Sequence, residues 1–219
     1  MSTPAQVSAL DMRGRSITTF VVYEIASRVD RCEVGQAVDV VVDDTEALDR
    51  DLRAWSAATG NEVRGGAPTA GGREYSIVKG VPRETDLALA MVISNPGLFE
   101  LLSPLGFALA ASLEGISVRI YFQAQAVRVL KSGFTPRIQG VARPFSRFAR
   151  RGLERAGHVH PQDKLRQLEQ RGADFYLCGP SMEHFKVSKE DLIFPDAKIA
   201  AYLTFMSVMA ESDIHVFVQ

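Results

Sequence analysis

Residues 87–122 read LALAMVISNPGLFELLSPLGFALAASLEGISVRIYF, in which two apolar strand-like runs flank an apolar helix-like run. The run 87–94 is continuously apolar, and the Asn95-Pro96-Gly97 turn follows it. We expect a helix over 97–114 and a second strand over 117–122, which is the β-α-β pattern of a parallel sheet. The stretches 87–99 and 101–113 together exceed the roughly 20 residues that span a bilayer, but the turn divides them. A buried strand followed by a buried helix is therefore expected, not a membrane helix.

The pattern continues toward the C-terminus. A helix over 161–171, a strand over 174–178, a helix over 198–212 and a strand over 213–218 are predicted from apolar periodicity and from the Gly172 stop. Strands that alternate with helices predict an α/β fold with a doubly wound, mainly parallel sheet. The pattern is lost across residues 125–160, which we interpret as a basic insertion.

Toward the N-terminus, a smaller domain is predicted. Its expected elements are a strand over 9–13, a helix over 18–29, a strand over 37–42, a helix over 45–59 that Gly60 ends, and strands over 62–64 and 74–79. The Gly-rich run 65–72 is expected to be a hairpin loop. This β-α-β-α-β-β order predicts a two-layer domain over residues 1–80, and the charged segment 80–86 separates it from a second domain over 86–219.

The composition excludes several functional classes. Apolar residues make up 46% of the chain and charged residues 23%, and the net charge is -1, so no nucleic-acid partner is expected. Cys32 and Cys178 are the two cysteines and fall in different predicted domains, which argues against a disulfide framework. Residues 1–10 lack the apolar core of a signal peptide. We therefore expect a cytoplasmic protein.

Cys178 is the candidate for chemistry. It ends a predicted parallel strand, and ligands bind at the carboxyl ends of strands in open α/β sheets. Backbone N–H groups of Gly179, Ser181 and Met182 are positioned to stabilise a thiolate, and His184 is placed to add positive charge. The alternative is that Cys178 is a buried apolar filler, as many free cysteines are.

Asn95 is a second pocket candidate, because it follows the first strand of the second domain. The surrounding turn lacks the Gly-x-Gly-x-x-Gly fingerprint of dinucleotide sites, so no cofactor is expected. His158 and His160 lack a third partner, and no metal site is predicted.

Three C-terminal segments carry a family resemblance: FYLCGPSME at 175–183, VSKEDLI at 187–193 and DIHVFV at 213–218. With them, residues 86–219 resemble the DsrE/DsrF-like superfamily, and more narrowly its DsrE2 branch. The resemblance implies that Cys178 carries sulfane sulfur as a persulfide. It also implies a homo-oligomer and a sulfur-carrier or sulfur-acceptor protein as partner.

The N-terminal part resembles the TusA/SirA-like fold. The residues that carry this resemblance are Leu10-Asp11-Met12-Arg13-Gly14, Gly35, Asp43-Asp44, Trp55 and Thr59-Gly60. Where that family places Cys-Pro-x-Pro, this chain reads Ile17-Thr18-Thr19-Phe20, so the family's persulfide activity is not expected here. The resemblance implies a docking role for residues 1–80.

Residues 128–155 hold eight cations against one acid, with Phe134, Phe145 and Phe148 among them. We favour a solvated insertion whose aromatic side chains contact the core, because Pro136, Gly140 and Pro144 interrupt any long helix. The alternative is a weak contact with an anionic surface. The arginines that would make it are Arg143, Arg147, Arg150 and Arg151.

Two functions follow from these observations. The first is sulfur relay, in which Cys178 accepts sulfane sulfur and passes it on, a sulfurtransferase-like activity. The second is a non-catalytic binding or assembly module of the same folds, in which Cys178 is structural and resists alkylation.

Overall fold

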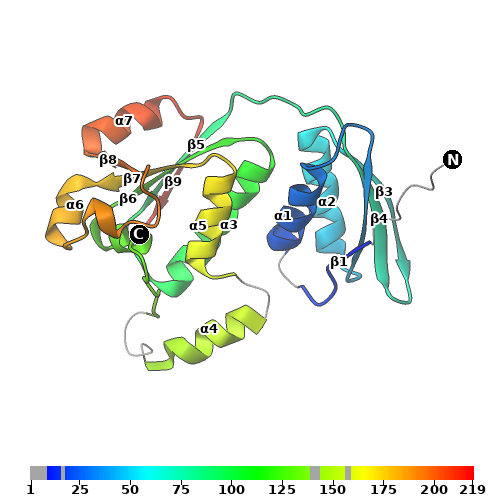
Figure 1. Ribbon diagram of the computed structural model, residues 1–219, viewed down its shortest axis with the longest axis horizontal. Coiled ribbons are helices and arrows are strands. Elements are labelled where there is room, and N and C mark those ends of the chain that lie inside the picture. Colours follow the sequence, from blue (N-terminus) through cyan, green and yellow to red (C-terminus); the bar gives the residue numbers. More distant parts are fainter. Residues whose placement is uncertain (1–8, 16–17, 139–143, 156–158) are drawn as a thin grey trace. The chain divides into compact units, whose positions relative to one another are not determined.

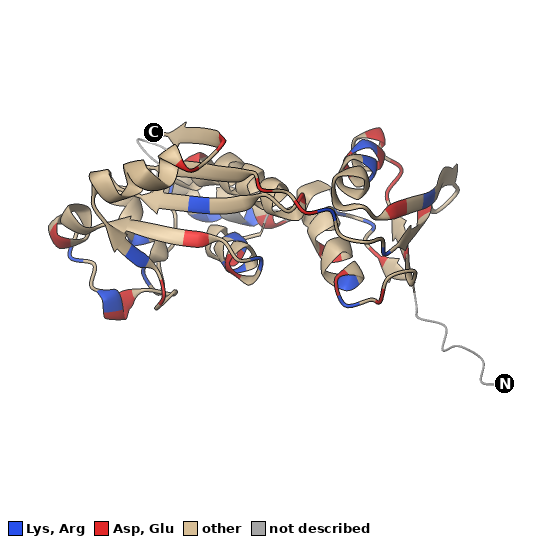
Figure 2. Cartoon of the chain, turned by 90° about the horizontal axis from the view of Figure 1, so that it is seen from above, with Lys and Arg blue, Asp and Glu red and all other residues tan. Residues whose placement is uncertain are grey.

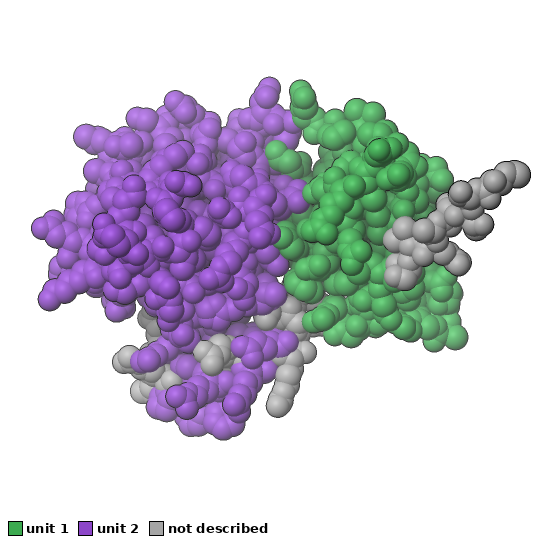
Figure 3. Space-filling view, viewed as in Figure 1, with its two compact units in different colours: residues 1–84, 113–115, 156–158 green, residues 85–112, 116–155, 159–219 purple. Residues whose placement is uncertain are grey.

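The computed structural model describes residues 9–15, 18–138, 144–155 and 159–219, without the side chains of Arg150 and Arg155. The chain divides into two compact units, coloured separately in Figure 3. Unit 1 comprises residues 1–84, 113–115 and 156–158, and unit 2 comprises the remainder.

Unit 1 pairs two helices with a four-stranded sheet of order β1-β2-β4-β3. The pairing of β1 with β2 is parallel and the other two pairings are antiparallel. Its elements are β1 (Leu10–Asp11), α1 (Thr18–Val29), β2 (Ala37–Val42), α2 (Glu46–Thr59), β3 (Glu62–Thr69) and β4 (Gly72–Val78).

The core of unit 1 forms where the helices cover one face of this sheet. Apolar side chains of α1 recur with helical spacing, and Val21, Ile25 and Val29 are fully buried. Strand β2 alternates buried and exposed residues, as expected when only one face of a sheet is covered. Helix α2 ends at Thr59, and Gly60 forms its C-cap with a positive φ of 81°.

The Gly-rich run of unit 1 is not the hairpin loop that the sequence indicated. Strand β3 continues through it to Thr69, and β4 starts at Gly72, so the turn itself is short. The register shifts between Gly65 and Pro68, where Gly65 and Gly66 have positive φ. Glycine tolerates this conformation, so the run forms a β-bulge within the ladder.

Unit 2 contains a five-stranded sheet of order β8-β7-β6-β5-β9, in which every pairing is parallel. The prediction of an α/β protein with a doubly wound parallel sheet is thus confirmed (Figure 1). The elements are β5 (Ala88–Ile93), α3 (Leu98–Leu113), β6 (Ser117–Phe122), η1 (Ala124–Leu130), α4 (Ser146–Arg155), α5 (Pro161–Gln170), β7 (Asp174–Cys178), α6 (Gly179–His184), η3 (Lys189–Asp191), β8 (Lys198–Ala200), α7 (Tyr202–Ala210) and β9 (Ile214–Val218).

Helices cover both faces of the parallel sheet. Because crossovers between parallel strands are right-handed as a rule, the connections from β5 to β6 and from β6 to β7 place α3 and α5 on one face, and the return from β8 to β9 across the sheet places α7 on the other. Lys164 of α5 donates from Nζ to the Leu102 carbonyl of α3 (3.1 Å), which joins the two helices. Every residue of β5 is buried, and charged residues are sparse along these strands (Figure 2).

One predicted helix of unit 2 was too long. Residues 198–212 were expected to be helical, but 198–200 form β8, whose residues pair with Tyr176, Leu177 and Cys178 of β7. Helix α7 starts at Tyr202. The uncharged stretch 199–210 has no sharp periodicity, so only the pairing with β7 distinguishes strand from helix.

Candidate functional site

Cys178 is the last residue of β7 and directly precedes α6. The Tyr176 ring meets Phe205 of α7 edge-on (centroids 5.3 Å apart). Side chains two residues apart on a strand share a face, so the Cys178 thiol lies on the side of the sheet that α7 covers. The residue is only 2% exposed. The thiol is therefore enclosed at the carboxyl end of the sheet.

The Ser181 hydroxyl, the Ser181 backbone N–H and the Tyr121 hydroxyl act on the Cys178 sulfur, and Tyr121 also donates its hydroxyl to the Ala200 carbonyl (3.4 Å). Burial alone raises the pKa of the Cys178 thiol, but the bonds from Ser181 and Tyr121 outweigh burial, and the pKa lies below the ordinary thiol value. Burial, followed by the bond to Cys178, raises the pKa of Tyr121, so this phenol remains a donor. The surroundings of the sulfur thus favour a thiolate.

Local backbone geometry positions these donors. Pro180 lies in the first turn of α6 and fixes its start, which brings the Ser181 N–H and hydroxyl toward the strand end. The Ser181 Oγ also accepts from the N–H of Ala124 (3.0 Å). Ala124 is the first residue of η1 and follows the end of β6 by two residues. Ala124 has a φ of 47°, which a residue with a Cβ rarely adopts. Ser181 therefore ties the end of β6 to the turn that holds the thiol.

A model of the DsrE/DsrF-like family matches residues 89–217, which is more than half of the chain and includes this whole site. The chain belongs to the DsrE/DsrF-like family. Among solved structures, the crystal structure of the YchN protein from E. coli is similar to this chain with a TM-score of 0.42 and 15% identity, covering 60% of this chain and 98% of that one. No curated protein matches the chain. The DsrE2 branch and the TusA-like character of residues 1–80 stay predictions.

The other residues predicted around the thiol of this DsrE/DsrF-like domain fall into two groups. Gly179 and Met182 share the α6 turn with Ser181, and the Met182 side chain is buried as packing material. His184 lies at the end of α6 and contacts the Phe185 ring edge-on (4.7 Å between centroids). The described ring contact of His184 is therefore with Phe185, not with the Cys178 sulfur.

Asn95 lies at the carboxyl end of β5, as expected. Its Oδ1 accepts from the Gly97 N–H (2.9 Å), which closes a local turn before α3. Strand β6 lies between β5 and the strand that carries Cys178. Asn95 therefore closes a local turn, at a strand that is not a neighbour of β7 in the sheet.

Tyr121 is the site residue that sequence reasoning missed. It lies inside β6, where it reads as an ordinary core residue, and its ring stacks on Phe205 (4.6 Å between centroids). The available signal was its place one residue before the carboxyl end of β6, beside the strand of Cys178. A polar group at that height of a neighbouring strand is a candidate partner for the thiol.

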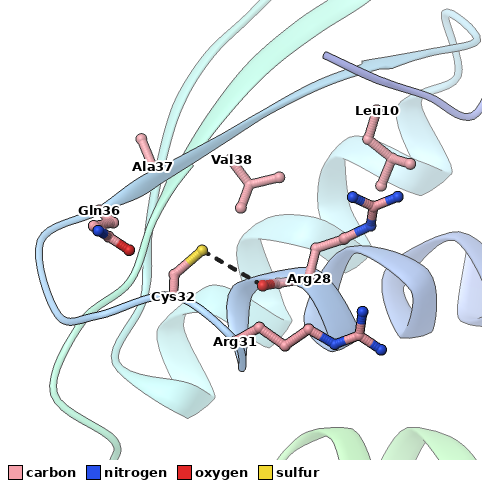
Figure 4. Close-up of a pocket in the computed structure, with 7 residues that line it drawn as sticks. All are labelled: Leu10, Arg28, Arg31, Cys32, Gln36, Ala37 and Val38. Atoms are coloured by element: carbon pink, nitrogen blue, oxygen red, sulfur yellow. Dashed lines mark hydrogen bonds between the residues drawn. The ribbon is translucent and has the colours of Figure 1, made fainter. Parts of the chain in front are cut away.

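Cys32 has a different environment, in unit 1. It follows α1, and its Sγ donates to the Arg28 carbonyl (3.5 Å) at the C-terminal end of that helix (Figure 4). A cavity of about 410 Å³ opens beside it. The lining residues are Leu10, Arg28, Arg31, Cys32, Gln36, Ala37 and Val38.

Two further findings concern ligands and membranes. Within the described ranges, no group of three or more His, Cys, Asp or Glu side chains is arranged to hold a metal ion. Across the same residues, no helix combines the length and the apolarity needed to cross a bilayer.

Proposed function

We propose that this DsrE/DsrF-like protein is a sulfur-relay protein in which Cys178 carries sulfane sulfur. The observation that supports the proposal most is the set of donors from Ser181 and Tyr121 to the sulfur. A thiol that only fills space in a core needs no such donors. A sulfur that must be charged to react does need them.

The chemistry is a pair of thiol exchanges. The Cys178 thiolate attacks the terminal sulfur of a persulfide donor R–S–SH, a new S–S bond forms, and the donor leaves as the thiolate R–S⁻ with the electron pair of the broken bond. Cys178 then holds –S–SH. An acceptor thiolate attacks that outer sulfur in the same way and regenerates the Cys178 thiolate. Ser181 and Tyr121 stabilise Cys178 whenever it is anionic.

The partner in this relay is a second protein that bears the donor or acceptor thiol. Unit 1 is proposed as its docking surface, because the chain reads Ile17-Thr18-Thr19-Phe20 where a TusA-like carrier would have Cys-Pro-x-Pro, so unit 1 lacks a carrier thiol at that position. Burial of Cys178 sets a condition on this role. Helix α6 or α7 must move before a protein-borne thiol can reach the sulfur, whereas a small inorganic polysulfide needs a smaller opening.

Mass spectrometry after polysulfide treatment of the native protein tests the proposal. We expect wild type and Cys32→Ser to gain the mass of added sulfur on Cys178, and Cys178→Ser to lose that adduct. Cys32→Ser is the matched control, because it removes the other thiol of the chain. Identical spectra for wild type and Cys178→Ser would contradict the relay.

The second function, a non-catalytic assembly module, is favoured by one specific observation, which is the 2% exposure of Cys178. The structure also offers a candidate surface for such assembly. The outer side of α7 exposes Tyr202, Leu203 and Met206, of which Leu203 is 84% exposed. Uncharged apolar surface of this kind is typical of subunit interfaces. Light scattering on wild type and Leu203→Glu tests whether this face holds a homo-oligomer together.

A further inference from the structure

Helix α4 is amphipathic, and its apolar side begins one residue before the helix. Phe145, Phe148, Ala149 and Leu153 recur at the spacing of one helical face. Arg147 and Arg151 are four residues apart and lie on the opposite side, because each residue turns the helix by about 100°. The helix thus separates an aromatic side from a cationic side.

The two aromatic side chains of this helix face solvent. Phe145 is 61% exposed and Phe148 is 74% exposed. The sequence-based expectation that these phenylalanines contact the core is therefore wrong. Two exposed phenylalanines within four residues leave apolar area in water that burial in an apolar phase would stabilise.

The charge on α4 complements an anionic surface. Its ten residues contain four arginines and a single acid, Glu154. Arg147 and Arg151 are both exposed. The net charge of the whole chain is -1, so the positive charge here is a local feature, not part of a general basic character.

We propose that α4 docks the protein on an anionic membrane surface. Phe145 and Phe148 enter the boundary between headgroups and acyl chains, while Arg147 and Arg151 remain among the lipid phosphates. The opposed faces favour a membrane over a polyanion. A groove for single-stranded nucleic acid needs aromatic and cationic groups that point the same way, so that bases stack while phosphates are neutralised.

Co-sedimentation of the full chain with vesicles tests this inference. We expect binding to vesicles of phosphatidylcholine mixed with phosphatidylglycerol and little binding to phosphatidylcholine alone. Phe145→Ser with Phe148→Ser should weaken binding on the order of tenfold or more, from the apolar area removed. Arg147→Glu with Arg151→Glu should weaken it on the order of tenfold or more and reduce its sensitivity to salt.

Two matched controls separate this helix from general surface effects. Phe107→Ser with Phe217→Ser removes two phenylalanines that are exposed elsewhere (68% and 64%). Arg50→Glu with Arg83→Glu makes the same change in net charge at exposed positions of unit 1. Both control variants should bind anionic vesicles as wild type does.

Several outcomes would overturn the inference. One is the absence of co-sedimentation, and another is unchanged vesicle binding in either α4 variant. The third is that the phenylalanine variant binds an oligothymidylate as strongly as wild type does, which would identify a polyanion site instead. Persulfide loading of Cys178 in solution should be equal in all these variants, so failure of the docking is distinguishable from failure of the sulfur relay.

Discussion

Cys178 and Cys32 lie at opposite ends of helices, and their sulfurs therefore have different hydrogen-bond partners. Cys178 precedes α6 and receives bonds from Ser181 and Tyr121. Cys32 follows α1 and gives its own proton to the Arg28 carbonyl. Free N–H groups at a helix start favour a sulfur anion, and free carbonyls at a helix end favour a protonated thiol. The enclosed thiol thus has partners that stabilise an anion, whereas the more accessible one donates its proton to a carbonyl.

The largest effect is expected when the aromatic side chain that covers the Cys178 site is removed. Phe205 stacks on Tyr121 and contacts Tyr176, so Phe205→Ala should cost about 3–5 kcal/mol of unfolding free energy. It should also raise the alkylation rate of Cys178 toward that of Cys32. Chemical denaturation and mass-resolved alkylation measure the two effects. Phe107→Ala is the control, because this side chain is exposed and its loss should change neither.

The second test compares the two thiols directly in the native protein. At neutral pH, iodoacetamide should modify Cys32 on the order of a hundredfold faster than Cys178, because opening of a buried core site costs several kcal/mol. In denaturant the two rates should become similar. Native rates that are already similar would mean that the Cys178 site opens readily, which would favour relay to a protein partner.

The third test weakens the donors one at a time. Ser181→Ala and Tyr121→Phe should each raise the pKa of Cys178, and the loss of one hydrogen bond to a charged group should lower its thiolate fraction at neutral pH roughly tenfold. The thiolate absorbance against pH measures this in a Cys32→Ser background. Tyr202→Phe is the control, since Tyr202 contacts the Tyr121 ring and the Cys178 sulfur has Tyr121 and Ser181 as its donors. An unchanged titration in both donor variants would contradict the thiolate assignment.

The smallest effect expected is on the pH dependence of stability. The pKa of Cys178 is lower in the folded protein than in the unfolded chain, so its contribution is fully present above the unfolded thiol pKa and is lost as pH falls through the folded pKa. The stability difference between wild type and Cys178→Ala should therefore grow with rising pH in this window. Urea unfolding of both proteins at several pH values measures this difference.

The sequence predicted the regular parts of the fold well. The bounds of α1, β2, β6 and β7 agree with the structure, because strong apolar periodicity marks them, and α2 and α5 end close to the predicted stop residues Gly60 and Gly172. The bulge at Gly65 and the strand β8 were missed. Both depend on pairing with a neighbouring strand, which the local pattern does not contain.

The candidate site was predicted only in part. Cys178 and Ser181 are neighbours in sequence, so their shared turn was foreseeable from Pro180 and the strand end. Tyr121 lies 57 residues before Cys178 and joins it only through the parallel pairing of β6 with β7. The exposure of Phe148 was also unforeseen, because apolar residues are expected inside unless the path of the chain keeps them out.

The hydroxyl of Ser181 accepts from the Ala124 N–H while it donates to the Cys178 sulfur. The Ser181 hydroxyl therefore interacts both with the backbone at Ala124, just after β6, and with the thiol of Cys178. Coupling of this kind is reciprocal: if loading of the sulfur shifts the conformation at Ala124 by some free energy, a partner that prefers that conformation shifts sulfur loading by the same amount. A single shared hydroxyl thus links the Cys178 sulfur to the exposed backbone at Ala124.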